Sequence, residues 1–135
     1  MAHWIVKSEP ASYSWNDLLR EGGTEWTGVR NAAAALNLRA MKVGDTAFFY
    51  HSVTDKALVG IVRTTRTARP DGEGERWVSV AIEPVEPLAR PITLAEIKAT
   101  PALADMTLLR QSRLSVAPVT DAHWKTLLAM AAKPA

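Results

Sequence analysis

The chain has 135 residues, of which 47% are hydrophobic and 22% charged, a composition that fits one globular domain over residues 1–135 and argues against long disorder. Its formal charge of +2 permits an anionic partner without requiring one, and the absence of cysteine excludes disulfide scaffolds, thiolate nucleophiles and zinc ribbons. Because no apolar run has the roughly 18 residues of a membrane span and the N-terminus lacks a signal-peptide pattern, we expect a soluble cytoplasmic protein without a membrane partner.

The first half of the chain predicts strands alternating with helices. Polar residues able to cap free backbone N–H groups mark where the helices begin, and glycine or proline marks where elements end. In chain order we predict a strand over 3–7 that stops before Pro10, a helix after the cap Ser14, a helix over 32–41 after the cap Asn31, and a doubly covered strand over 47–50.

The second half predicts a hairpin followed by short elements. The β-branched runs 58–65 and 77–85 flank a loop over 70–74 with the Pro, Asp and Gly of a turn, so we expect the two runs to pair. Further along we predict a short helix capped by Thr93, a strand over 114–116 and a last helix capped by Asp121. Because these elements lack regular βα alternation, they favour an α+β fold, a small bent mixed sheet or pseudo-barrel of about five or six strands with flanking short helices.

The motifs of common catalysts are absent from the sequence. There is no Gly-x-Ser-x-Gly elbow, no phosphate-binding glycine loop and no His-Glu-x-x-His pair, and the three histidines are isolated in sequence. We therefore expect no metal and no cofactor, and a binding module in preference to an enzyme.

Four segments, in this order, resemble the EVE domain. They are Lys7-Ser8-Glu9-Pro10 with Tyr13-Ser14, Trp26-Thr27-Gly28-Val29-Arg30-Asn31, Met41-Lys42-Val43-Gly44-Asp45 leading into Phe48-Phe49-Tyr50-His51-Ser52, and Arg110-Gln111-Ser112-Arg113-Leu114-Ser115-Val116 with Pro118-Val119. The resemblance implies a PUA-like fold related to the YTH readers of methylated adenine, and non-catalytic binding of a modified base in DNA or RNA. The chain departs from the family after Asn31, where Ala32-Ala33-Ala34-Ala35-Leu36 replaces a polar stretch containing Gln and Arg.

Trp26, Ser8 and Glu9 are the leading candidates for the base pocket. A flipped or single-stranded base needs an aromatic face, and Trp26, in a predicted loop before Gly28, would provide it, although a core position is the alternative. Ser8 and Glu9 leave the first strand at Pro10 and would read the edge of the base. Because a carboxylate accepts hydrogen bonds from the exocyclic amine of cytosine, Glu9 favours modified cytosine. Capping of a backbone donor or an ion pair with Lys7 is an equal alternative for Glu9.

Four further residues are candidates for the same pocket. Asn31 is able to bond a base edge, but the helix cap is the favoured interpretation. Tyr50, His51 and Ser52 end a strand where it enters a loop, a position that often lines a site. For Tyr50 a core position, and for His51 a structural hydrogen bond, are the alternatives.

Basic and polar residues are candidates for phosphate contact, because guanidinium groups bind phosphate with one or two hydrogen bonds. The set is Lys7, Arg30, Arg110, Gln111, Ser112 and Arg113. A solvated surface or an internal salt bridge is the alternative for each arginine. Arg63, Arg66 and Arg69, near the acidic hairpin tip, are expected to form an ordinary charged surface.

Two other functions are compatible with the same residues. In a small hydrolase acting on a modified nucleoside, Lys7 and Glu9 would serve as base and acid, provided that burial shifted their pKa values. In a protein-interaction module, the fold would persist without its ligand, as the run Ala32–Ala35 suggests.

Overall fold

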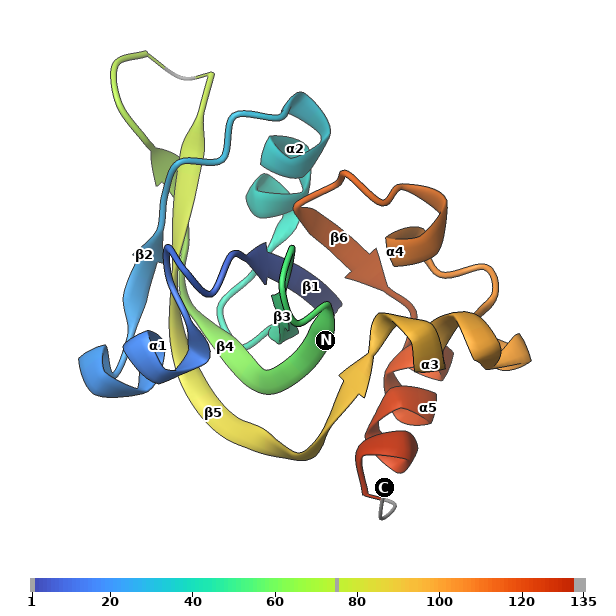
Figure 1. Ribbon diagram of the computed structural model, residues 1–135. Coiled ribbons are helices and arrows are strands. Elements are labelled where there is room, and N and C mark those ends of the chain that lie inside the picture. The colour runs from blue at the N-terminus through green and yellow to red at the C-terminus, as the bar shows by residue number, and fades with distance from the viewer. Residues whose placement is uncertain (1, 75, 133–135) are drawn as a thin grey trace.

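A single mixed sheet forms the centre of the computed structural model, which describes residues 2–74 and 76–132 (Figure 1). Within these residues the sheet has six strands in the order β2-β5-β4-β3-β1-β6. The strands are β1 (His3–Ser8), β2 (Thr24–Trp26), β3 (Thr46–His51), β4 (Ala57–Pro70), β5 (Val78–Thr93) and β6 (Val116–Val119). β1 and β3 are parallel and every other neighbouring pair is antiparallel, so β2 and β6 remain as open edges.

Helices cover the sheet and its ends. They are α1 (Trp15–Glu21), α2 (Ala32–Ala40), α3 (Leu94–Ala99), a 3-10 turn (Pro101–Leu103), α4 (Thr107–Arg110) and α5 (Asp121–Ala131). Figure 1 shows β4 and β5 as two long, curved ribbons that run around the shorter strands, and register shifts at several points of this pair account for the bend. The prediction of a bent mixed sheet of about five or six strands is confirmed, and the structure shows that this sheet does not close into a barrel.

The central strands are buried on both faces. Alternation along β1 and β3 sends Val6 and Phe49 into one hydrophobic core with Trp15 and Trp26, and Ile5 and Phe48 into a second core with Trp124 of α5. The expected double covering of residues 47–50 is therefore confirmed.

Local capping explains why α1 and α2 begin where predicted, whereas α4 was not predicted from the sequence. Ser14 and Asp17 form a reciprocal capping box, and the Asn31 side chain accepts a hydrogen bond from the backbone N–H of Ala34 at 2.9 Å. The cap of α5, however, is Thr120 and not Asp121, because the Thr120 hydroxyl accepts from the N–H of His123 at 3.1 Å.

The strand boundaries differ from the prediction at four places, the first of which is β4, which continues to Pro70 instead of ending at Thr65. β6 begins at Val116, later than expected, and the sequence analysis missed the short strand β2, which places Trp26 in a strand and not in a loop. β5 continues past Pro84 and Pro87, although proline has no backbone N–H to donate. This is possible because β2 pairs with β5 only up to Ile82, and beyond Ile82 one side of β5 has no partner strand that would accept an N–H.

Candidate functional site

The end of β1, the turn that follows it, β2 and the loop after β2 enclose a groove that we call the Trp26 groove. Its volume of about 430 Å³ lies within the range of small-molecule pockets, roughly 300–1,000 Å³. Five of the predicted site residues line it, namely Lys7, Ser8, Glu9, Trp26 and Arg30. The other lining residues are Ser12, Tyr13, Thr24, Glu25, Thr27, Gly28, Val29 and Ser115.

Trp26 provides the aromatic wall of this groove while also belonging to the core. It ends β2, pairs with Val80 and is 8% exposed. Its ring meets Tyr13 and Phe49 edge-on, with centroids 6.3 Å and 5.6 Å away. The packing fixes the orientation of the indole, and the remaining exposure faces the groove that Trp26 lines.

Ser8 and Glu9 form the polar wall where the chain leaves β1. The Glu9 carbonyl accepts from the N–H groups of Ser12 and Tyr13, at 2.9 Å and 2.8 Å, and the Ser8 hydroxyl donates to the Tyr13 carbonyl at 2.5 Å. These bonds fix the turn after Pro10 and leave the Ser8 oxygen able to accept. The Glu9 carboxylate is exposed, and no side chain or backbone group of residues 2–74 and 76–132 donates a hydrogen bond to it. It is therefore available as an acceptor.

Lys7 borders the groove from β1. Its ammonium group donates to the Ser112 carbonyl at 2.8 Å and lies 5.8 Å from the centre of the Tyr50 ring. Burial lowers the pKa of Lys7. Within the described residues no ion pair joins Lys7 to Glu9, so the ion pair offered as an alternative role for Glu9 is not formed.

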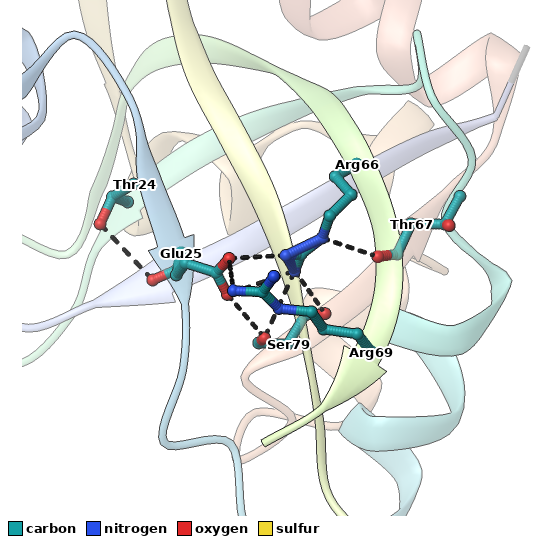
Figure 2. A network of polar contacts seen from close by, with 6 residues as sticks. All are labelled: Thr24, Glu25, Arg66, Thr67, Arg69 and Ser79. Atoms are coloured by element: carbon teal, nitrogen blue, oxygen red, sulfur yellow. Dashed lines mark hydrogen bonds and ion pairs between the residues drawn. The ribbon is translucent and has the colours of Figure 1, made fainter. Parts of the chain in front are cut away.

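A network around Glu25, which the sequence analysis missed, holds β2 in place (Figure 2). The Glu25 carboxylate accepts from Arg66 at 2.6 Å and 3.2 Å, from Arg69 at 2.6 Å and from the Ser79 hydroxyl at 2.8 Å. Glu25 and Arg66 both lie opposite Ala81 of β5, one from each side. The edge strand is thereby joined through charged groups to β4 and β5.

The expectation of an ordinary charged surface at Arg63, Arg66 and Arg69 is therefore wrong for two of the three. Arg63 makes an exposed ion pair with Glu83, whereas Arg66 and Arg69 both form ion pairs with Glu25. The partners lie 41 and 44 residues apart in sequence, so no local pattern could reveal them.

Arg30 stands at the other end of the groove and is anchored from one side. Its guanidinium donates to the Asp71 carboxylate at 3.0 Å, and the same oxygen accepts from the Gly28 N–H at 2.9 Å. The Gly28 hydrogen bond, and after it Arg30, lowers the pKa of Asp71. Gly28 has a φ of 79°, a left-handed conformation that glycine adopts without strain. With 47% of its side chain exposed, Arg30 keeps donors for a second anion.

The other predicted pocket residues lie outside the Trp26 groove. Tyr50 and Ser52 line a second groove with Lys7 and Ser112. His51 is buried, where its Nε2 accepts from the Trp15 N–H at 3.0 Å and its Nδ1 faces the Asp55 carboxylate at 2.8 Å.

The predicted polar segment after α4 is separate as well. Asn31, Ala33, Gln111, Ser112 and Arg113 line a small hollow at the start of α2, and Arg110 lines another near α5. Of the alanine run, Ala34 and Ala35 are buried against the sheet while Ala32 and Ala33 are exposed. The run therefore packs against the sheet through Ala34 and Ala35 and presents only methyl groups at Ala32 and Ala33, whereas the polar side chains of α2, Asn37 and Arg39, lie further along the helix.

The pKa of Tyr13 gives a direct test of the groove geometry. Burial, together with a hydrogen bond to the Glu21 carboxylate, raises the pKa of Tyr13 to about 12, and burial also raises that of Tyr50. In the unfolded chain tyrosine ionises near pH 10, so stability should fall as pH rises from about 10 to 12. In a near-ultraviolet titration of tyrosinate, we expect neither tyrosine to reach half-ionisation at pH 10 in the folded protein.

Tyr13→Phe is the matched control, because the chain has only two tyrosines. The variant should lose the transition near pH 12 and keep that of Tyr50. A full equivalent ionising near pH 10 in the folded protein, and missing from Tyr13→Phe, would contradict the hydrogen bond to Glu21.

Comparison with known proteins identifies the family. The sequence model of the EVE domain matches residues 2–130. The chain belongs to the EVE domain family. Thymocyte nuclear protein 1 of Homo sapiens is 32% identical over 168 aligned residues, which cover 98% of this chain and 75% of the human protein.

Solved structures support the same assignment. An Agrobacterium tumefaciens protein shares 40% identity at a TM-score of 0.95, covering 98% of this chain and 94% of the other. The human THYN1 protein in complex with 5-methylcytosine containing DNA shares 30% identity at a TM-score of 0.94, with full coverage of both chains. This EVE domain thus has the architecture of a homologue solved with methylated DNA.

The YTH domain is similar at the level of the fold. The YTH domain of Zygosaccharomyces rouxii MRB1, solved in complex with N6-methyladenosine RNA, has a TM-score of 0.64 at 14% identity and covers 99% of this chain and 88% of its own. The relation to YTH domains implied by the sequence resemblance is confirmed as a shared fold.

Two further observations concern the described part of this EVE domain. Residues 2–74 and 76–132 hold no cluster of three or more His, Cys, Asp or Glu side chains placed to bind a metal. None of the helices described there has both the length and the apolar character needed to cross a bilayer.

Proposed function

We propose that this EVE domain is a non-catalytic nucleic-acid binding module that takes a modified base, most favourably a modified cytosine, into the Trp26 groove. The observation that carries the proposal is that one groove is lined both by the rigid aromatic side chain of Trp26 and by Glu9, whose carboxylate has no hydrogen-bond partner among the described residues. The human homologue in complex with 5-methylcytosine containing DNA supports the ligand class.

The groove offers both kinds of contact that a base requires. Trp26 and Tyr13 present aromatic groups for stacking, and Val29 adds apolar surface suited to a methyl group. Glu9 would accept from the exocyclic amine of cytosine, which a base presenting a carbonyl at that position lacks. Ser8, with a lone pair left free, would accept a second donor or bond a water molecule.

Positive groups at both ends of the groove would hold the backbone. Lys7 borders one end and Arg30 the other, and each already has one hydrogen-bonded anchor that limits its conformational freedom. Such phosphate contacts position a strand without reading its sequence, and they make affinity depend on salt.

A titration of matched single strands carrying plain, 5-methylated or 5-hydroxymethylated cytosine tests the proposal by fluorescence anisotropy. Wild-type protein should prefer a modified strand, and Glu9→Gln should lose roughly 1–3 kcal/mol of the discrimination between cytosine and other bases. The amide has a donor as well as an acceptor, so it is also able to bond a base that presents a carbonyl. Because Glu9 is exposed, the variant should fold normally.

Glu86→Gln is the matched control, since Glu86 is also exposed, lies on β5 and lines neither groove. It removes the same charge and should leave base discrimination intact. Equal, salt-sensitive binding to all strands would instead indicate a basic surface without a base pocket.

A further inference from the structure

The second groove, which Tyr50 and Ser52 line, is bordered by three lysines, and we call it the lysine groove. Its volume is about 470 Å³, and it lies between the end of β1, the loop after β3, and helices α3 and α4. Three lysines, Lys7, Lys56 and Lys98, stand around an apolar wall to which Leu94 and Leu108 contribute. None of the described residues that line it is acidic.

The three positive charges are not neutralised within the described chain. No ion pair with an aspartate or glutamate involves Lys7, Lys56 or Lys98 among residues 2–74 and 76–132. Charges of one sign around a low-dielectric wall raise the local concentration of counter-ions. An anionic group bound there would offset their mutual repulsion.

The loop that carries Lys56 is held in an unusual conformation. Val53 and Lys56 have φ values of 68° and 48°, in the left-handed region that non-glycine residues avoid, and Val53 is 65% exposed. Two backbone bonds fix the loop, from the Ser52 N–H to the Ser8 carbonyl at 2.9 Å and from the Leu94 N–H to the Lys56 carbonyl at 2.8 Å. Such strain clusters at ligand sites, where the fold holds a loop for a purpose other than stability.

We propose that the lysine groove is a second nucleotide site, which takes another nucleotide of the strand whose modified base enters the Trp26 groove. The apolar wall suits a base or sugar, and Lys56 and Lys98 suit its phosphate. Lys7 borders both grooves, which makes them neighbours around the end of β1. This inference rests on the proposed function, and it extends the contact from one base to a strand.

The test compares two double variants of equal charge. Lys56→Gln with Lys98→Gln neutralises the lysine groove, and Lys42→Gln with Lys125→Gln removes two exposed lysines that border neither groove. Each protein is titrated with a single strand carrying 5-methylcytosine at several salt concentrations, and with the nucleoside 5-methyldeoxycytidine. Each phosphate neutralised on a single strand contributes about 0.7 to the slope of log K against log salt. Because Lys56 and Lys98 would share the phosphate of one nucleotide, the first variant should lose about 0.7 from the slope.

The nucleoside separates the two grooves. It lacks a phosphate, so both variants should bind it as the wild type does and keep the preference for a modified strand. Suppose that the wild type prefers the modified strand, but that the slope of log K against log salt is the same for both double variants. The lysine groove then does not contact the strand, and the second site is overturned.

A third arm keeps the test decisive if base recognition itself fails. A plain deoxynucleoside monophosphate is titrated while the NMR methyl signals of Leu108 and Leu109 are followed. Shifts in the wild type that disappear in Lys56→Gln with Lys98→Gln, without any modified-base preference, would assign the lysine groove to a free nucleotide and overturn the proposed strand path. If the wild type shows neither a preference for the modified strand nor NMR shifts with the monophosphate, the base pocket and the second site are both overturned.

Discussion

Replacing Trp26 with alanine should weaken binding of a strand carrying 5-methylcytosine by about 1–3 kcal/mol, or 5- to 150-fold, because the base loses its stacking partner. The same change removes a core side chain that is 8% exposed and should lower the free energy of unfolding by about 3–5 kcal/mol. Anisotropy titration and denaturant unfolding measure the two effects separately. Trp26→Phe, which keeps a ring, should retain part of the affinity.

Leu38→Ala is the control for the loss of stability. Leu38 lies on α2, is fully buried in the same core as Trp26 and lines neither groove, and its truncation should cost about 2–5 kcal/mol. A folded Leu38→Ala protein should bind the modified strand as the wild type does. If Trp26→Ala binds as tightly as Leu38→Ala under conditions where both are folded, Trp26 is a core residue that happens to border the groove, and the stacking role fails.

The elements that local chemistry determines were predictable from the sequence. Ser14 with Asp17, Asn31 and Thr93 place hydroxyl, carboxylate or amide groups where the first helical N–H groups need acceptors, and these helices begin where expected. β2 was not predictable, because Thr24–Trp26 is a strand only through its pairing with Val80–Ile82 more than fifty residues away.

Some residues of the candidate site were likewise predictable from the sequence and others were not. Ser8 and Glu9 were found because Pro10 interrupts the strand beside them, and both line the groove with Trp26. Tyr50 was expected there too, but alternation along β3 places its side chain in the second core while Phe49 contacts Trp26. A one-residue difference in position thus moves a side chain to the other face of the sheet, and motif order alone does not indicate which face.

Glu25→Ala should lower stability and base selectivity together, while raising affinity for plain strands. The carboxylate accepts hydrogen bonds from Arg66, Arg69 and Ser79, and Ser79 is 2% exposed. Its removal leaves these donors without their acceptor, at a cost of about 1–3 kcal/mol. The two arginines beside the Trp26 groove would then add uncompensated positive charge, which attracts any strand, and β2 would hold Trp26 less firmly.

Glu83→Ala is the matched control, because Glu83 lies on the same pair of long strands and, within residues 2–74 and 76–132, pairs only with Arg63. An exposed pair of this kind contributes at most about 1 kcal/mol. Unfolding by denaturant and anisotropy with plain and methylated strands measure all three effects. If Glu25→Ala lowers stability but retains the wild-type preference for the methylated strand, the network is structural only. A smaller ratio with tighter, more salt-dependent binding of the plain strand would instead show that Glu25 keeps Arg66 and Arg69 from acting as an unspecific phosphate site.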